Sequence, residues 1–428
     1  MEFIQFGLLI APMLILMGLS LPIFLAMGIT CLLFALLFDL PLMVLPQSYV
    51  RGLAVYDLLA LPFYFLAGDL MNAGGITARL VKFSEALIGH IRGGLSHVTI
   101  ISSMIFAGVS GSAVADASAI GSVLIPTMKK NGYPSSYVAA LTAASSTIGP
   151  IIPPSIPMVV YGLLTQVSIG RLFLAGAIPG ILMGVYLLVV SFHISYRRGY
   201  PANQRATLKQ LFRSFIDAAP ALMMPAIILG GIVIGIVTPT EAGAIAVVYG
   251  LVIGCFVYRE INLKDLPRIF GQTMVNTATI MIIIATTGLF CWIIANMGLG
   301  GVLVKMFQSI STNKWIILAI INVFFLFWGC FLDPVTAMLI IVPILIPLVQ
   351  QLGIDLVHFG LIVVLNLMIG LVTPPVGILL YLSSSMANVK LGLMLKELVP
   401  FLLALFLVLA MSTYIPSIVM WLPNLLIK

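Results

Sequence analysis

Two proline-rich stretches, at residues 145–157 and 366–378, interrupt apolar runs that are otherwise long enough to span a membrane. They share a glycine and a proline pair at a constant separation of 221 positions, in the pairs Gly149 and Gly370, Pro153 and Pro374, and Pro154 and Pro375. Matched breaks in the two halves of a hydrophobic chain are a sequence signal for a transporter's binding site. We therefore expect these two breaks to carry the chemistry of the chain.

Proline cannot donate a hydrogen bond to the carbonyl four residues before it, because its nitrogen carries no hydrogen. The prolines of the breaks, together with Pro334, therefore release the carbonyls of Ser146, Gly149, Pro150, Pro153, Cys330, Gly370 and Leu371. Unpaired carbonyls are costly in hydrocarbon, and a dehydrated Na⁺ is one partner for them. The positive ends of the half-helices that follow suit a substrate carboxylate. Alternatively, the prolines only kink the helices, and nearby hydroxyls bond back to carbonyls of their own helix.

Hydroxyl side chains accompany both breaks, namely Ser145, Ser146, Thr147 and Ser155 in the first and Thr373 in the second. Two further segments with polar centres supply Ser110, Ser112, Asp116 and Asp333. A carboxylate inside a membrane is functional by default. The alternative is that Asp116 and Asp333 hold turns in shape by accepting bonds from backbone N–H groups.

The composition is that of an integral membrane protein. The chain has 428 residues, of which 61% are hydrophobic and 8% charged, and its mean hydropathy is +1.21. This leaves too little polar surface for a soluble globule. The apolar runs are about twenty residues long and do not alternate, which indicates helices rather than barrel strands. The net charge of +7 comes from basic loops between these runs, so no nucleic-acid partner is expected.

Eight runs have the length of a membrane span, at residues 3–20, 22–40, 57–73, 173–196, 217–237, 240–258, 269–297 and 397–422. Residues 95–130 and 313–350 have polar ends and a small or polar centre. We expect each to form a re-entrant hairpin with arms of about 15 residues, or about 22 Å. Residues 135–168 and 355–388 then form the two broken helices.

The basic residues predict the orientation. With the linker at residues 200–213 in the cytoplasm, fifteen of the twenty Lys and Arg residues lie on the cytoplasmic side. This satisfies the positive-inside rule, and both termini then face the periplasm. The two hairpins enter from opposite faces of the membrane. Residues 1–199 and 214–428 are therefore expected to be inverted-topology repeats in an all-α polytopic membrane protein.

Residues 74–92 carry Ile76, Leu80, Phe83 and Leu87 at helical spacing. We expect this segment to lie along the membrane interface as a brace, with residues 260–270 as a weaker counterpart. Such arms suggest a fixed frame beside a moving part.

Two other function classes fit the residues less well. A passive channel would need a continuous polar lining, whereas these spans consist mostly of Leu, Ile and Val. An intramembrane enzyme would need Asp116 and Asp333 to share protons at close range. Because each aspartate has its own broken helix nearby, two separate sites are favoured over one catalytic pair.

The motifs resemble those of a known family. Residues 108–121 (GVSGSAVADASAIG), 148–157 (IGPIIPPSIP) and 370–377 (GLVTPPVG) are similar to the large membrane subunit of tripartite ATP-independent periplasmic (TRAP) transporters, and the resemblance covers the whole chain. The first hairpin and first break most resemble the sialic-acid members. The resemblance implies an elevator-type secondary transporter of the bacterial inner membrane, driven by a Na⁺ gradient, whose moving domain contains the hairpins and broken helices.

The resemblance also implies partners and site residues. The partners are a small four-helix membrane subunit, expected as a separate chain, and a soluble periplasmic binding protein. The expected substrate is an organic acid, sialic acid (N-acetylneuraminate) or alternatively a C4-dicarboxylate. By motif position, the first Na⁺ site contains Ser110, Ser112, Gly149, Ile152 and Pro154, and the second contains Gly329, Cys330, Asp333, Thr373 and Val376. The residues expected near the substrate are Asp116, Ser145, Ser146, Thr147, Ser155 and Pro374. No catalytic residue and no cofactor other than Na⁺ is expected.

Overall fold

The computed structural model describes residues 2–427, which form helices and contain no β-strand. Six helices in this range are long and apolar enough to cross a membrane, or seven if one bent pair is counted as a span. The predicted all-α polytopic fold is thus confirmed. The first two helices are shorter than predicted, with 17 and 15 residues.

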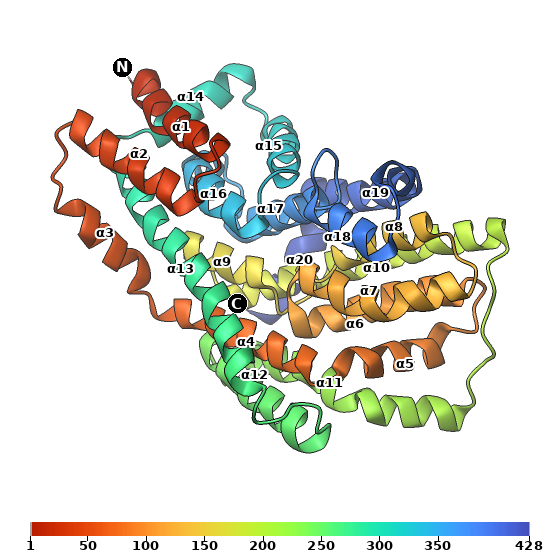
Figure 1. Cartoon of the computed structure of the whole chain (residues 1–428). Helices are drawn as coiled ribbons and strands as arrows, with labels where there is room; N and C mark the ends of the chain where they lie inside the picture. Colours follow the sequence, from red (N-terminus) through yellow and green to blue (C-terminus); the bar gives the residue numbers. More distant parts are fainter. Residues whose placement is uncertain (1, 428) are drawn as a thin grey trace.

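The two halves of the chain present similar helices in the same order (Figure 1). The first half contains α1 (Glu2–Gly18), α2 (Ile23–Leu37), α3 (Val44–Leu53), η1 (Tyr56–Leu59), α4 (Ala60–Ala73), α5 (Ile76–Ile88), α6 (Gly94–Ser110), α7 (Ala113–Lys130), α8 (Ser135–Ser146), α9 (Ile156–Thr165) and α10 (Ile169–Arg198). The second contains α11 (Leu208–Ile234), α12 (Pro239–Val252), η2 (Ile253–Val257), α13 (Leu266–Asn296), α14 (Gly300–Ile310), α15 (Lys314–Gly329), α16 (Pro334–Gln351), α17 (Leu356–Gly370), α18 (Ile378–Ala387), α19 (Leu391–Tyr414) and α20 (Pro416–Leu426).

Two helix pairs occupy the segments predicted as hairpins, α6 with α7 and α15 with α16. In the first turn, Gly111 has a φ of +59°, a conformation that favours glycine. Ser112 then caps α7 by accepting a hydrogen bond from the N–H of Ala115, and Asp333 caps α16 by accepting one from the N–H of Thr336. The arms have 16 to 18 residues, slightly more than expected.

The two broken helices lie at the centre of the protein. α8 is separated from α9 by residues 147–155, and α17 from α18 by residues 371–377. Every residue from Tyr137 to Ser146 and from Val357 to Gly370 is buried. α8 packs against α7, α18 and α19, and α17 packs against α15, α16 and α19. The helices that lead into both breaks are therefore enclosed by other helices, whereas residues 374–376 of the second break are exposed.

We divide the helices into a frame group and a core group, which also contact each other, for example through α5 with α6 and α14 with α16. In the frame group, comprising α1–α5 and α11–α14, α13 contacts α2, α3 and α4, while α12 packs along α4. Figure 1 shows α13 running the length of this group, from α2 to α12. The core group comprises α6–α10 and α15–α20, where α10 and α19 contact each other and both flank the broken helices.

Three predicted boundaries are wrong. The linker predicted at 200–213 ends at Thr207, because Thr207 and Gln210 form a capping box that starts α11 there. The span predicted at 397–422 is divided at Ile415, because Pro416 disfavours a helical conformation of the residue before it. Residues 260–270 are not an interfacial arm, since α13 begins at Leu266 with a proline in its first turn.

In the first half, α5 follows α4 and precedes the first hairpin. In the second half, α14 follows α13 and precedes the second hairpin. The structural counterpart of the brace at residues 74–92 is therefore α14 rather than residues 260–270.

Candidate functional site

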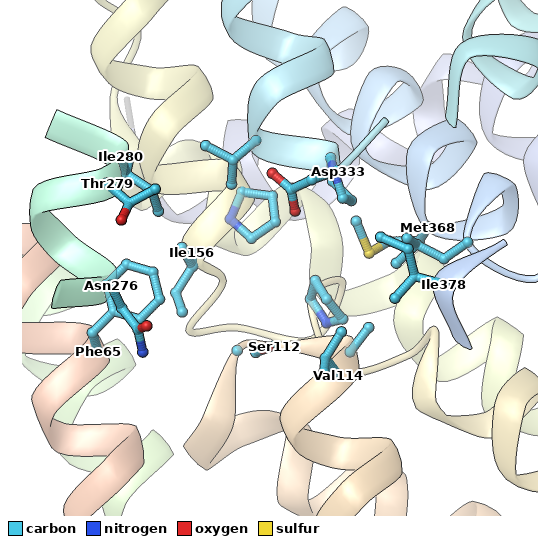
Figure 2. A pocket seen from close by; sticks show the side chains of 17 residues that line it. Phe65, Ser112, Val114, Ile156, Asn276, Thr279, Ile280, Asp333, Met368 and Ile378 are labelled. Carbon is cyan, nitrogen blue, oxygen red and sulfur yellow. The ribbon is translucent and has the colours of Figure 1, made fainter. Parts of the chain in front are cut away.

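A cavity of about 310 Å³ lies between the turns of the two hairpins. Figure 2 shows Ser112 and Val114 of the first hairpin on one side and Asp333 of the second on the other. The remaining walls come from both breaks, through Pro150 and Leu371, and from the frame helices. The cavity thus joins parts of the chain that are more than 200 residues apart.

Four helices begin at this cavity. Its lining includes the first residues of α7, α9, α16 and α18, namely Ala113, Val114, Ile156, Pro157, Pro334, Val335 and Ile378. The first turn of a helix leaves N–H groups without intrahelical partners and carries a partial positive charge. Convergence of four such ends favours a negatively charged ligand, whereas the Asp333 carboxylate in the same lining opposes one, and the lining contains no Lys or Arg.

The frame group supplies a polar wall that the sequence analysis missed. Phe65 of α4 and Asn276, Thr279 and Ile280 of α13 line the cavity, and Figure 2 shows Asn276 and Thr279 on the same helix. A signal was present, because Thr273, Asn276 and Thr279 recur every three residues in an apolar run. Such a stripe within a span faces protein or a polar cavity rather than lipid.

The structure brings the first hairpin turn against the first break. A methyl group built on Gly149 would lie 3.4 Å from the carbonyl oxygen of Ser112 and 3.5 Å from Oδ2 of Asp116. One built on Gly111 would lie 2.7 Å from the carbonyl oxygen of Pro154. Of the residues predicted for this cation site, Ser110, Ser112, Gly149 and Pro154 therefore lie at one junction. The side chain of Ile152 instead packs against Gly180 of α10.

Asp116 is fully buried at this junction, with an exposed fraction of 0%. Neither of its carboxylate oxygens has a hydrogen-bond partner among the described residues. A buried carboxylate without a donor or counter-charge is strongly unfavourable. Either a proton on Asp116 or a bound cation would remove this penalty, so the junction can accommodate a cation.

The second hairpin turn meets the second break in a similar way. A methyl group built on Gly370 would lie 2.6 Å from the carbonyl carbon of Gly329, so the two backbones are in direct contact. The N–H of Gly377 donates to the carbonyl oxygen of Cys330 at 3.0 Å. Asp333 faces the cavity, and the hydroxyl of Thr373 donates to the carbonyl oxygen of Ile369 at 2.7 Å. Val376 lies in the same break and is 37% exposed.

Most of the released carbonyls find other donors, contrary to the expectation that they remain unpaired. Those of Ser146 and Gly370 accept from backbone N–H groups within their own break, and that of Leu371 accepts from the N–H of Leu379 in α18. That of Pro150 accepts from the hydroxyl of Ser155, and that of Cys330 from the N–H of Gly377. Only the carbonyls of Gly149 and Pro153 have no such partner among the described residues. The breaks fold back on themselves, because local re-pairing avoids the cost of an unpaired group.

The residues predicted near the substrate do not line the cavity. The hydroxyls of Ser145, Ser146 and Thr147 are buried and donate to carbonyls one turn earlier in α8, as the alternative interpretation proposed. The Ser155 hydroxyl caps α9 by accepting from the N–H of Met158, and Pro374 is exposed in the second break without lining the cavity.

Asp116 lies on the face of α7 opposite to Val114 and Ser118, because two residues correspond to about 200° around a helix. It therefore faces the first break rather than the cavity, whereas Asp333 lines the cavity. The two aspartates belong to different sites, which argues against a shared catalytic pair.

Comparisons with known proteins agree with the geometry. The family profile described as "Tripartite ATP-independent periplasmic transporter, DctM component" matches residues 8–418. The sialic acid TRAP transporter large permease protein SiaM of Vibrio cholerae is 41% identical over 379 residues, covering 89% of this chain and 89% of that protein. The C4-dicarboxylate TRAP transporter large permease protein DctM of Pseudomonas aeruginosa is 38% identical, covering 89% of this chain and 90% of that protein.

Among solved structures, the YdaH transporter of Alcanivorax borkumensis superimposes with a TM-score of 0.63 over 86% of each chain, at 14% sequence identity. At this identity the likeness supports the fold alone. The family match and the identities to the two permeases go further: this chain is a multi-pass membrane protein that belongs to the DctM family of TRAP transporter large permeases.

Proposed function

We propose that this protein imports an organic acid across the bacterial inner membrane in symport with Na⁺, and that the substrate binds in the cavity between the hairpin turns. The observation that carries this proposal is the convergence of four helix N-termini on one cavity of about 310 Å³. Helix N-termini bind carboxylates through free N–H groups. The side chains of Ser112, Ser155 and Asp333 already cap three of these helices, so the substrate would use the remaining N–H groups of the first turns. Asn276 and Thr279 supply further hydrogen bonds for hydroxyl or amide groups of the substrate.

Coupling to Na⁺ is supported by the unpaired oxygens beside the first break. Asp116 and the Gly149 carbonyl offer negative charge and an oxygen ligand at one junction, close to Ser110 and Ser112. We assign a second cation to the junction of Gly329, Cys330, Asp333, Thr373 and Val376, although several of its groups already have hydrogen bonds. A carbonyl oxygen has two lone pairs, so the Cys330 carbonyl can serve a cation as well as Gly377.

The movement that we propose is an elevator motion of the core group against the frame group. If residues 1–199 and 214–428 are inverted repeats, the two hairpins enter the membrane from opposite faces. The position of their turns on opposite sides of the cavity supports this arrangement (Figure 2). Both junctions and all four helix N-termini belong to the core group, so the ions and substrate would travel together. Both termini would then face the periplasm.

The substrate that we favour is N-acetylneuraminate, with C4-dicarboxylates as the alternative. The name of the V. cholerae relative supports the first, and that of the P. aeruginosa relative supports the second. By analogy with the family, the partners would be a small four-helix membrane subunit and a periplasmic binding protein that delivers the substrate.

The proposal is tested by uptake into proteoliposomes that contain the purified membrane complex, without ATP. The assay adds the cognate binding protein loaded with radiolabelled N-acetylneuraminate or succinate, with NaCl or choline chloride outside. We expect uptake of one acid only, and only with both the binding protein and inward Na⁺. Uptake that is undiminished in choline chloride would refute Na⁺ coupling, and uptake of succinate alone would select the alternative substrate.

A further inference from the structure

A second cavity, of about 230 Å³, adjoins the first on the side where α4 ends. The two cavities share five lining residues, Phe65, Ser112, Val114, Ile156 and Asn276. The second cavity also reaches Ser110 and Ser112, which form the first hairpin turn. It is thus connected both to the substrate cavity and to the proposed first cation site.

Polar side chains of the frame group line this second cavity. Asp69 and Asn72 lie on the same face of the last turn of α4 as Phe65, and Asn276 projects from α13. The hydroxyl of Thr273 on α13 donates to Oδ2 of Asp69 at 2.6 Å, which holds the carboxylate between the two helices. Ser110, Ser112 and Ser118 of the first hairpin stand opposite. A polar face inside a membrane protein is favourable only where it meets water or a ligand.

The charge of this cavity has one sign. Asp69 is the only ionisable side chain among its lining residues, and neither cavity is lined by Lys or Arg. A low-dielectric cleft that carries one sign of charge concentrates ions of the opposite sign. The volume is far above the 10–15 Å³ or so that a single water needs, so a cation can keep part of its hydration shell.

We propose that this second cavity is a transit site for the coupling cation, in which Asp69 draws a partly hydrated Na⁺ to and from the junction at Ser110 and Ser112. Thr273 positions the Asp69 carboxylate. The amide oxygens of Asn72 and Asn276 accept from Thr77 and Gln272, and each keeps a second lone pair for a cation along the path. The inference rests on the proposed Na⁺ coupling. In it, Asp69 of the frame group changes the rate at which the cation reaches its site and not the equilibrium affinity of that site.

The electrostatic part is tested without transport. An Asn72→Cys variant of the whole chain, purified in its membrane complex, reacts with a cationic (trimethylammonium) or an anionic (sulfonate) methanethiosulfonate reagent. The parent protein with its four native cysteines supplies the background rate. Relative to a free thiol, we expect the cationic reagent to be favoured by about tenfold at low ionic strength. Adding Asp69→Asn should remove most of this preference. Equal rates with the two reagents, or a preference that Asp69→Asn leaves intact, would overturn the proposal.

Two control variants separate charge from structure. Asp39→Asn makes the same change at an exposed position outside the cavity and should leave the reagent preference unaltered. Thr273→Val removes the hydrogen bond to Asp69 but keeps the charge, whereas Asp69→Asn keeps an acceptor for Thr273. If the hydrogen bond between Thr273 and Asp69 had only a structural role, Thr273→Val would change the reagent preference more than Asp69→Asn does. The transit role predicts that Asp69→Asn has the larger effect and that the effect shrinks in high choline chloride.

The transport part uses the uptake assay and the acid that the unaltered complex imports. Asp69→Asn should lower the initial rate about tenfold at low ionic strength, while the NaCl midpoint of thermal stabilisation stays within about threefold. If the unaltered complex shows no Na⁺ dependence, the proposed function fails and this inference fails with it. If the unaltered complex depends on Na⁺ but Asp69→Asn behaves like Asp39→Asn, only this inference fails.

Discussion

The contact between Gly370 and Gly329 gives the sharpest prediction for a single substitution. The atoms nearest to a methyl group on Gly370 are the carbonyl carbon, Cα and carbonyl oxygen of Gly329, at 2.6, 2.7 and 2.9 Å. All three are backbone atoms, so no side-chain rotation can relieve the overlap. In Gly370→Ala, the second hairpin turn and the second break must separate by about 1 Å to restore an ordinary contact.

The size of the effect follows from this geometry. Overpacking costs about 1–3 kcal/mol, and replacing a helical glycine by alanine returns at most about 0.5–1 kcal/mol. The difference spans about 0–2.5 kcal/mol, and because the overlap is with backbone atoms we take a net loss of about 1–2 kcal/mol for the arrangement that forms the proposed second cation site. One to two kcal/mol corresponds to a change of about 5- to 30-fold in an equilibrium constant. We therefore expect the Na⁺ concentration needed for half-maximal stabilisation to rise by about that factor.

The assay is thermal unfolding of the purified complex, titrated with NaCl at constant ionic strength in choline chloride. Gly329→Ala probes the same contact from the other side, where a methyl group would lie 3.3 Å from its nearest neighbours, and should have an intermediate effect. Gly230→Ala on α11 is the matched control, because no atom lies within 4 Å of its added methyl group. A folded Gly370→Ala variant whose Na⁺ midpoint equals that of Gly230→Ala would refute the reasoning.

Three further predictions concern other contacts. Asp116→Asn should raise the melting temperature in choline chloride, because it removes an unpaired buried charge, and should abolish most of the stabilisation by NaCl; an unchanged response to NaCl would contradict this. The side-chain amide of Asn366 donates to Oδ1 of Asn322 at 2.8 Å. Asn366→Leu and Asn322→Leu should each lower the free energy of unfolding by about 1–3 kcal/mol in chemical denaturation, and the double variant should lower it by less than the sum; strict additivity would show that the bond has no role. Combining Ser112→Ala with Thr373→Ala should remove NaCl-dependent stabilisation, and its survival in that variant would exclude hydroxyl ligands at both junctions.

The breaks and hairpins could be predicted because their signals are local. Proline lacks an N–H wherever it occurs, and single prolines such as Pro179 stay inside helices, but the proline pairs 153–154 and 374–375, each with a glycine shortly before it, stop α8 and α17. The caps of the second hairpin arms are equally local, since Ser112 and Asp333 each accept from an N–H three residues later. The break at Ile415 had a similar signal in Pro416, which the continuous apolar run from 397 to 422 obscured.

The walls of the cavity could not be derived in the same way, because they depend on packing between distant segments. Asn276 reaches the cavity only because α13 packs against α4 and against α16 of the second hairpin. The hydroxyls of Ser145 and Thr147 are adjacent to the break in sequence, yet they bond to their own helix. Likewise, no local rule predicts that the N–H of Gly377 donates to the carbonyl of Cys330, because that bond joins the second break to the turn of the second hairpin.

The most direct test of coupled transport is a dual-label measurement in one set of vesicles. Proteoliposomes with the complete complex receive ²²Na⁺ and the ¹⁴C-labelled acid together, and the influx of each label is counted over the same initial interval. The two proposed cation junctions beside the proposed substrate cavity predict substrate-dependent Na⁺ influx at a fixed ratio of about two ions per acid, lost in Asp116→Asn. Influx of the acid without any accompanying Na⁺ would contradict the proposed coupling.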